Sequence, residues 1–219
     1  MIYAIISVVL AYLIGSINFA VIFSKLFTKK DVREMGSGNA GATNVLRTAG
    51  LLPGILTFVC DALKGFVACF IGKTLFLSGF SASDSFPAAE YAIYLAFLCG
   101  LFCMLGHVFP IFFKFRGGKG VAVAVGIFYV CCPIAITIGL VCFILSILIS
   151  KIVSLSSLLA TLTVVVFTAV FYNRGAALLW QLVLAALMGL IVFLKHSDNI
   201  KRLIKGEEKH IKIGRKKDV

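Results

Sequence analysis

Six long stretches of the chain contain almost no charged side chains, and this pattern limits the possible folds more than any other feature. The stretches are 2–24, 51–77, 91–113, 121–150, 152–173 and 175–194, and only 51–77 contains any Asp, Glu, Lys or Arg. A helix crosses the ~30 Å hydrocarbon core of a bilayer with about 20 apolar residues. Charged residues make up 14% of the chain, against roughly 25% in soluble domains. The sequence therefore predicts an all-α polytopic membrane protein, with one integral-membrane domain over residues 1–219.

The first apolar stretch is long and no basic residue precedes it. A secretory signal has a charged start and an apolar region of roughly 7–15 residues, so we expect an uncleaved first span. The seven cysteines all lie inside apolar stretches, and none belongs to a CxxC pair. We therefore expect them to be small buried hydrophobic residues and not disulfides or metal ligands.

The basic residues predict the topology, because they are enriched on the cytoplasmic side of membrane proteins. Segment 25–50 carries five basic residues, segment 114–120 carries three, and the tail after Leu194 carries nine. The connection 78–90 carries none, so we place it outside. The N-terminus is then also outside, and a basic tail from about residue 195 is cytoplasmic. The net charge of +12 has this topological explanation, so no nucleic-acid partner is expected.

The number of crossings depends on residues 121–150. A single crossing there gives six in total and places the strongly basic tail outside, whereas two crossings give seven and return it to the cytoplasm. Two helices in 30 residues are only about 22 Å long each. We therefore expect short helices broken at 131–133, extending past both ends of the stretch into Gly118 and Val153. The prediction is seven short transmembrane helices.

The loop after the first apolar stretch, GSGNAGATNVLR at 36–47, offers backbone N–H groups, hydroxyls and one cation to an anion. It contains a GxGxxG pattern, but no strand precedes it, and Ala42 stands where a nucleotide-binding lysine is required. Neither a dinucleotide nor ATP is therefore supported, and a hairpin with no ligand stays open as an alternative. The candidate ligand-binding residues of this loop are Gly36, Ser37, Gly38, Asn39, Asn44 and Arg47.

A second basic loop ends in RGGKG, directly before an apolar helix. Glycines allow close approach of a ligand, and the N-terminus of the helix that follows favours an anion. Lys119 adds a full charge, so this loop is a candidate phosphate cradle, whereas Lys114 and Arg116 are better explained as topological signals. His107, near the inner end of its span, is either a structural histidine or a ligand contact. The glycines of this cradle are Gly117, Gly118 and Gly120.

Two further groups of polar residues stand out. Asp61 and Lys64 lie one helical turn apart in an apolar stretch, where an isolated charge costs at least ~2.5–3.5 kcal/mol. We expect them to pair with each other or to face a polar cavity, as secondary site candidates together with His107. After the last apolar stretch, His196 and Asn199 share one helix face.

Several catalytic patterns are absent from the sequence. The nine acidic residues form no cluster with metal-ligand spacing, and there is no GxSxG. None of the histidines has an Asp five residues later, which excludes an H-x4-D acyltransferase dyad. No metal or cofactor is expected, and an enzyme built on this chain must act by binding and orienting its substrates.

Several motifs, taken in order along the chain, resemble those of the bacterial acyl-phosphate-dependent glycerol-3-phosphate acyltransferases of the PlsY type. They are GSINFA at 15–20, GSGNAGATNVLR at 36–47, DALKG at 61–65, GHVFPIFFKFRGGKGVA at 106–122, VSLSSL at 153–158 and HSDNIKRL at 196–203. The resemblance runs from Gly15 to about Gly206. One departure is Asn18, where the family motif has proline, and we expect it to alter the first helix without removing activity.

The resemblance implies transfer of a fatty acyl group from acyl phosphate to the 1-hydroxyl of sn-glycerol 3-phosphate. The products are lysophosphatidic acid and phosphate, in the first step of phospholipid synthesis. It also implies seven helices with an outside N-terminus, in a bacterial inner (plasma) membrane with the active site facing the cytoplasm. The implied partners are the two substrates, membrane lipids and, as a candidate, the enzyme that forms acyl phosphate. The implied active-site residues are Ser37, Arg47, Lys119, Ser154 (chosen among the serines of VSLSS), His196 and Asn199.

Two alternatives remain at this stage. Ser37 as a covalent nucleophile is less favoured, because no base lies beside it in sequence and an acyl phosphate is already activated. A transporter for a phosphorylated or carboxylated anion would use similar loops, but its site would lie near the bilayer midplane. The polar motifs are all predicted on one face of the membrane, which favours an enzyme at the interface.

Overall fold

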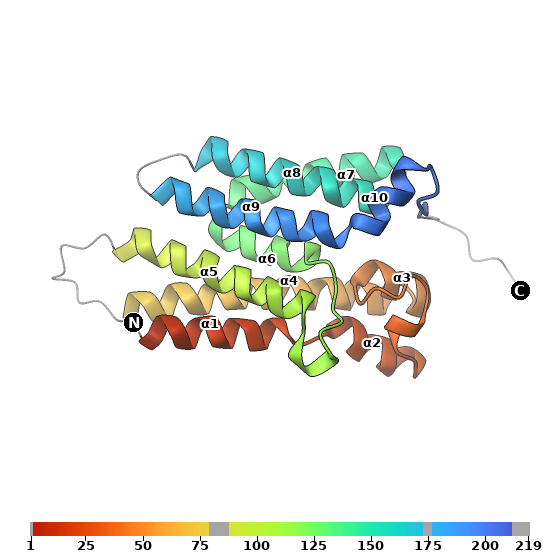
Figure 1. The fold of residues 1–219 in the computed structure, drawn as a ribbon, viewed down its shortest axis with the longest axis horizontal. Coiled ribbons are helices and arrows are strands. Elements are labelled where there is room, and N and C mark those ends of the chain that lie inside the picture. Colours follow the sequence, from red (N-terminus) through yellow and green to blue (C-terminus); the bar gives the residue numbers. More distant parts are fainter. Residues whose placement is uncertain (1, 79–87, 173–176, 212–219) are drawn as a thin grey trace, which may run out of the picture.

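The computed structural model of the protein describes residues 2–78, 88–172 and 177–211, and within these ranges it contains helices and no strands (Figure 1). The prediction of an all-α fold is thus confirmed there. Of the connection predicted at 78–90, residues 79–87 lie outside the described residues, whereas Ser78 belongs to α4 and residues 88–90 belong to α5. The helices are α1 (Ile2–Gly15), α2 (Phe19–Thr28), α3 (Ala42–Ala49), α4 (Leu51–Ser78), α5 (Ala88–Val108), α6 (Val121–Cys131), α7 (Pro133–Ser150), α8 (Val153–Phe171), α9 (Ala177–Lys195) and α10 (Ser197–Ile204), with 3-10 turns η1 (Val32–Glu34) and η2 (Ile111–Phe113).

Five segments of the described chain are long and apolar enough to cross a membrane, and a bent sixth pairs α9 with α10 at 61°. The 11-residue α6 is apolar but only about 16 Å long, shorter than the hydrocarbon core. The fold is that of an integral membrane protein. The five segments are Ile2–Thr28, Leu51–Leu75, Ala92–Phe113, Pro133–Ser150 and Val153–Phe171.

The first apolar stretch is interrupted between α1 and α2. Asn18 lies in the interruption, where its side-chain Oδ1 accepts a hydrogen bond from the Val21 N–H at 3.2 Å and caps α2. The departure from proline therefore places a helix cap at this break.

The stretch 121–150 forms two helices, α6 and α7, that meet at Cys132, within the predicted break. Pro133 begins α7, where its fixed φ angle and missing N–H are tolerated.

The predicted extensions of these two helices were wrong. The loop between α5 and α6 stays non-helical up to Gly120, the residue directly before α6, which has a left-handed φ of 87°. At the other end, α7 stops at Ser150, because the next residue, Lys151, has a left-handed φ of 56° and forms the C-cap. Neither Gly118 nor Val153 therefore belongs to α6 or α7.

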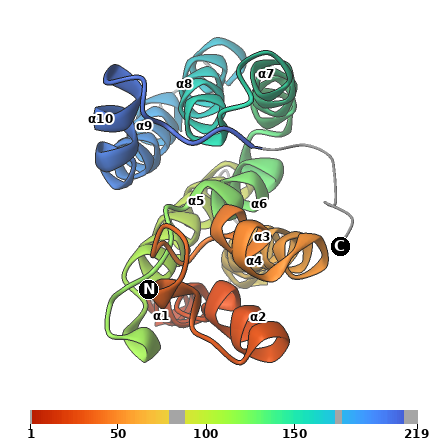
Figure 2. The ribbon, with the colours of Figure 1, turned by 90° about the vertical axis from the view of Figure 1, so that its right-hand side faces the viewer.

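The end-on view shows two groups of helices, with α1 to α5 on one side, α7 to α10 on the other and α6 between them (Figure 2). Small residues allow α4 and α6 to pack closely, since a Cβ added at Gly126 would lie 1.8 Å from the Ala62 carbonyl oxygen. The seven cysteines are all free; five of them are buried as predicted, whereas Cys60 and Cys142 are only partly buried.

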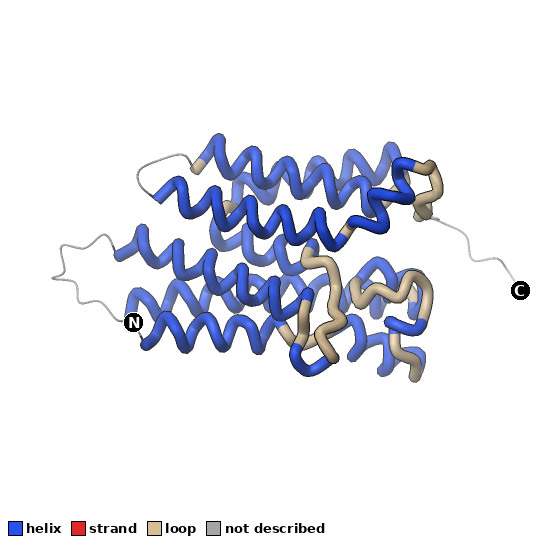
Figure 3. The backbone as a smooth tube through the Cα atoms, viewed as in Figure 1, coloured by secondary structure: helices blue, strands red, loops and turns tan. Residues whose placement is uncertain are grey.

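The long loops of the described chain lie with α2, α3 and α10 in the half of the molecule farther from the N-terminus (Figures 1 and 3). We call this the loop end.

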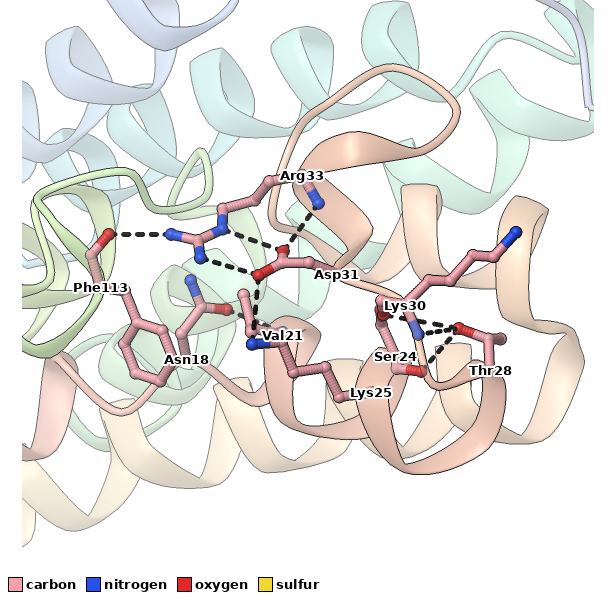
Figure 4. A network of polar contacts seen from close by, with 9 residues as sticks. All are labelled: Asn18, Val21, Ser24, Lys25, Thr28, Lys30, Asp31, Arg33 and Phe113. Carbon is pink, nitrogen blue, oxygen red and sulfur yellow. Dashed lines mark hydrogen bonds and ion pairs between the residues drawn. The ribbon is translucent and has the colours of Figure 1, made fainter.

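A polar network joins two loops of the loop end (Figure 4). Arg33 pairs with Asp31 at 2.8 Å and donates a hydrogen bond to the Phe113 carbonyl oxygen at 2.9 Å. The Arg33 guanidinium lowers the pKa of Asp31 to about 2. Arg33 therefore links segments 80 residues apart, a role beyond the topological one expected for it.

Candidate active site

A cavity of about 700 Å³ opens among the loop-end segments and continues between α6, α7, α8 and α9. Four of the predicted candidates do not line it: Gly36, Gly117, Gly118 and Lys64. The other twelve do, and they come from five separate parts of the chain: Ser37, Gly38, Asn39, Asn44, Arg47, Asp61, His107, Lys119, Gly120, Ser154, His196 and Asn199.

The first glycine loop is shaped by the buried side chain of Asn44, on α3. Its amide nitrogen donates to the carbonyl oxygens of Val32, Met35 and Asn39 at 2.9–3.1 Å. Its oxygen accepts the backbone N–H of Ser37 at 3.0 Å. Asn44 thus folds the loop that presents Ser37, and its hydrogen-bonding groups are engaged with the protein.

The second glycine loop lies directly against the end of α5. The Gly118 N–H donates to the His107 carbonyl oxygen at 3.2 Å, and a Cβ added at Gly117 would lie 1.9 Å from the same oxygen. Only glycine permits this approach. Gly117 and Gly118 thereby place Lys119 at the cavity without lining it themselves.

Lys119 is one of the cations that line the polar part of the cavity. Its Nζ donates a hydrogen bond to the Asn199 side-chain oxygen on α10. Burial lowers the pKa of Lys119 to about 8, although the Glu208 carboxylate opposes this shift. A partly buried ammonium with a lowered pKa is incompletely solvated, so it favours the arrival of an anion.

Glu208 connects the remaining polar groups, and the sequence analysis did not identify it. Its carboxylate accepts hydrogen bonds from Ser154 at 3.0 Å, Asn199 at 2.7 Å and Arg202 at 2.6 Å. Burial alone would raise the pKa of Glu208, but these donors outweigh burial and hold the pKa below its usual value. The one signal in the sequence was a pair of adjacent acidic residues, Glu207 and Glu208, inside a strongly basic tail.

His196 lies in the bend between α9 and α10. Its Nδ1 is 2.8 Å from the Val192 carbonyl oxygen, which can only accept, so Nδ1 carries the proton. The other ring nitrogen, Nε2, is then an acceptor in the neutral imidazole. His196 can therefore receive a hydrogen bond from a hydroxyl group in the cavity.

Comparison with known proteins decides the family. The family profile described as glycerol-3-phosphate acyltransferase matches residues 5–206. The glycerol-3-phosphate acyltransferase 2 of Bacillus anthracis is 39% identical over 94% of this chain and 98% of its own length. An enzyme named glycerol-3-phosphate acyltransferase from Thermoanaerobacter sp. (strain X514) is 39% identical over 99% of both chains. The chain belongs to the glycerol-3-phosphate acyltransferase family.

Solved structures agree with this assignment. The crystal structure of PlsY, an integral membrane glycerol 3-phosphate acyltransferase, in its glycerol 3-phosphate form has a TM-score of 0.81 and 34% identity, covering 95% of this chain and 96% of that one. The lysophosphatidic acid form of PlsY has a TM-score of 0.78 and 33% identity, with 95% of both chains covered. This chain is thus a bacterial-type membrane acyltransferase of phospholipid synthesis.

The acyltransferase cavity has a second, apolar part that the sequence analysis did not describe. It is enclosed by helix faces without charged side chains, and its lining includes Phe128, Ile136, Leu140, Phe143, Val164 and Met188. Phe128 is buried and packs edge-on against Phe97 with ring centroids 5.8 Å apart. The cavity is therefore amphipathic, with charged groups at the loop end and hydrocarbon deeper in the helix bundle.

The expected pairing of Asp61 and Lys64 in this acyltransferase is confirmed. Lys64 Nζ lies 2.7 Å from Asp61 Oδ1, and both side chains are buried. His107, on α5, completes the group, with its Nδ1 3.0 Å from Lys64 Nζ.

No group of three or more His, Cys, Asp or Glu side chains in the described ranges is placed to hold a metal ion.

Proposed function

We propose that this glycerol-3-phosphate acyltransferase uses acyl phosphate as its donor and forms lysophosphatidic acid and phosphate. The site residues proposed for this reaction are Ser37, Arg47, Lys119, Ser154, His196 and Asn199. The observation that carries the proposal is the amphipathic cavity. An acyl phosphate has a charged head and a hydrocarbon chain, and glycerol 3-phosphate has a second anionic group beside a hydroxyl.

The charged part of the cavity suits two phosphates. Lys119 and Arg47 supply cations, and the glycine loops supply backbone N–H groups. Arg47 is exposed and its Nη2 lies 3.4 Å from the Lys209 carbonyl oxygen, a long contact that an incoming phosphate can replace. The apolar part, between α6 and α9, suits the acyl chain.

The reaction needs orientation more than an enzyme nucleophile. The 1-hydroxyl oxygen of glycerol 3-phosphate attacks the acyl carbonyl carbon, and the bond from that carbon to the phosphate oxygen breaks. His196 Nε2 accepts a hydrogen bond from the attacking hydroxyl, and the departing phosphate takes the proton. Lys119 stabilises charge that develops on the phosphate, so positioning and electrostatics supply the rate.

A covalent acyl-serine is not part of this scheme. The Ser37 hydroxyl has no hydrogen-bond partner among the described residues, so no base is in place to activate it. Protein incubated with acyl phosphate alone should show no added acyl mass on Ser37. A trapped acyl-Ser37 that acylates added glycerol 3-phosphate would contradict the scheme.

The location also forms part of the proposal. The single domain over residues 1–219 would cross the bacterial inner membrane seven times, counting the short α6. The loop end, which holds the basic segments, would face the cytoplasm with its tail from about residue 195, where water-soluble glycerol 3-phosphate is available. Membrane lipids would surround the helices, and the enzyme that forms acyl phosphate is the proposed partner. The glycerol 3-phosphate and lysophosphatidic acid forms of the similar PlsY structure support this choice of substrate and product.

The test uses purified protein with glycerol 3-phosphate and either acyl phosphate or acyl-CoA as the donor. We expect lysophosphatidic acid and phosphate with acyl phosphate, and much slower product formation with acyl-CoA. A faster reaction with acyl-CoA would overturn the donor assignment. Uptake of glycerol 3-phosphate into proteoliposomes without acylation would instead support a transporter.

A further inference from the structure

The group formed by Asp61, Lys64 and His107 takes no part in the reaction described above. All three side chains are at least 95% buried, and two of them, Asp61 and His107, also line the cavity. The group bridges α4 and α5 and reaches the break between α1 and α2, because Lys64 Nζ donates to the Ile17 carbonyl oxygen at 2.8 Å. Three polar side chains buried together in this way need a reason beyond packing.

The contacts fix the state of His107. A lysine ammonium has three N–H donors and no acceptor. Lys64 Nζ donates to the Ile17 carbonyl oxygen at 2.8 Å and lies 3.0 Å from His107 Nδ1. It also forms an ion pair with Asp61 Oδ1 at 2.7 Å, although Oδ1 itself accepts no hydrogen bond. The direct distance from His107 Nδ1 to Asp61 Oδ1 is 3.6 Å, too long for a hydrogen bond. Nδ1 of His107 therefore accepts from Lys64, and the ring proton is on Nε2.

The protonated nitrogen lies where the two glycine loops meet. A Cβ added at Gly118 would lie 2.2 Å from His107 Nε2 and 2.7 Å from the carbonyl oxygen of Ala40, in the first loop. The backbone of His107 also holds the second loop through the Gly118 N–H. The next residue is Lys119, so His107 is placed to control the position of this cavity-lining cation.

We propose that the buried Asp61–Lys64 pair locks His107 as an Nε2–H donor, and that His107 is a positioning residue for the phosphate-binding end of the cavity. The donor lies at the junction of the two glycine loops, and it keeps Gly118 and Lys119 in the arrangement that receives a phosphate. The kinetic part of this inference rests on the proposed function, whereas the part concerning the ring proton does not.

The first test determines directly which ring nitrogen of His107 carries the proton. Protein labelled with 15N-histidine is reconstituted in bilayers, and the ring signals are assigned by single substitutions of its three histidines. We expect His107 to carry its proton on Nε2 and His196 to carry it on Nδ1, so that the two show opposite tautomers in one spectrum. A proton on Nδ1 of His107, or a doubly protonated ring at neutral pH, would overturn the inference whatever the activity of the protein.

The second test removes both charges of the Asp61–Lys64 ion pair, so the net charge of the buried group does not change. In the double variant Asp61→Asn with Lys64→Met, we expect His107 to become a mixture of tautomers and kcat/KM for glycerol 3-phosphate to fall about tenfold. Lys73→Met makes the same replacement on α4 away from the group and should change neither quantity. If the double variant kept both the His107 tautomer and the kcat/KM of the wild type, the Asp61–Lys64 pair would not be what fixes His107.

The third test separates a donor from a packing role and does not require the double variant to fold. Gln at position 107 can place an amide N–H near the position of Nε2, whereas Phe keeps the ring shape without a donor. We expect His107→Gln to keep KM for glycerol 3-phosphate within about threefold of the wild type, and His107→Phe to raise it about tenfold. Equal KM values in the two folded variants would contradict the positioning role. If the wild type formed no lysophosphatidic acid from acyl phosphate, the proposed function would fail while the tautomer result still stood.

Discussion

The two parts of the cavity are built in different ways. At the loop end, polar side chains are fixed by directional contacts within the protein: Asn44 holds one loop, and Glu208 joins Ser154, Asn199 and Arg202. In the apolar part, helix faces enclose a space without directional contacts. Hydrogen bonds depend steeply on distance and angle, whereas hydrophobic burial follows area. Single substitutions should therefore have large effects at the loop end and graded effects in the apolar part.

The largest effect is expected at Lys119 and Arg47, the two cations proposed to bind phosphate. Lys119→Ala and Arg47→Ala should each lower kcat/KM by about 100-fold or more, because a phosphate in a partly dehydrated site loses a charge-assisted hydrogen bond. Steady-state kinetics with both substrates varied provides the measurement. Lys114→Ala is the control, since Lys114 is exposed and does not line the cavity. Similar small losses for all three variants would mean that the basic loops are topological signals only.

The next effect concerns the connections that hold the loop end together. Glu208→Gln should lower kcat by about tenfold and reduce the thermal stability of the purified protein. The change removes the charge that Arg202 contacts at 2.6 Å and weakens the hydrogen bonds from Asn199 and Ser154. Glu207→Gln is the matched control, because the neighbouring Glu207 side chain is exposed. If the two variants behaved alike, the directional network would not explain the order of the loop end.

The same contrast explains what could be predicted from the sequence. Charge-free stretches revealed the helices and the break at Cys132, because each depends on local composition. The glycines beside Lys119 predicted a loop that approaches another segment closely, because no other residue type tolerates the contact with His107. Glu208 was missed because its partners lie up to 54 residues away, and the apolar part was missed because its lining has the same composition as lipid-facing surfaces.

A smaller effect is expected from pH at the loop end. The pKa of Lys119 is lowered to about 8 by burial, so in the empty cavity its positive charge is lost as the pH rises through about 8. KM for glycerol 3-phosphate should therefore increase above that pH and level off below it. Lys119→Arg keeps a cation at all these pH values, because a guanidinium does not lose its proton. A pH profile of KM that is identical in the wild type and the Arg variant would show that Lys119 is not the titrating group.

The smallest change is expected in the apolar part, and it should alter substrate preference without disturbing the loop end. Phe128 lies seven residues along α6 from Val121, about 10 Å from the loop end, and its buried ring faces the cavity. Phe128→Leu keeps an apolar side chain but frees space, so the ratio of kcat/KM for long and short acyl phosphates should shift a few-fold toward longer chains. Full truncation is avoided because Phe→Ala in a packed interior costs roughly 3–5 kcal/mol. Tyr129→Leu, on the exposed side of the same helix, should leave the ratio unchanged.

KM for glycerol 3-phosphate should stay constant in both the Phe128→Leu and the Tyr129→Leu variants, because hydrophobic burial in the apolar part adds no directional contact to the proposed phosphate site. A change in that KM as large as the change in chain preference would show that the two parts of the cavity are coupled.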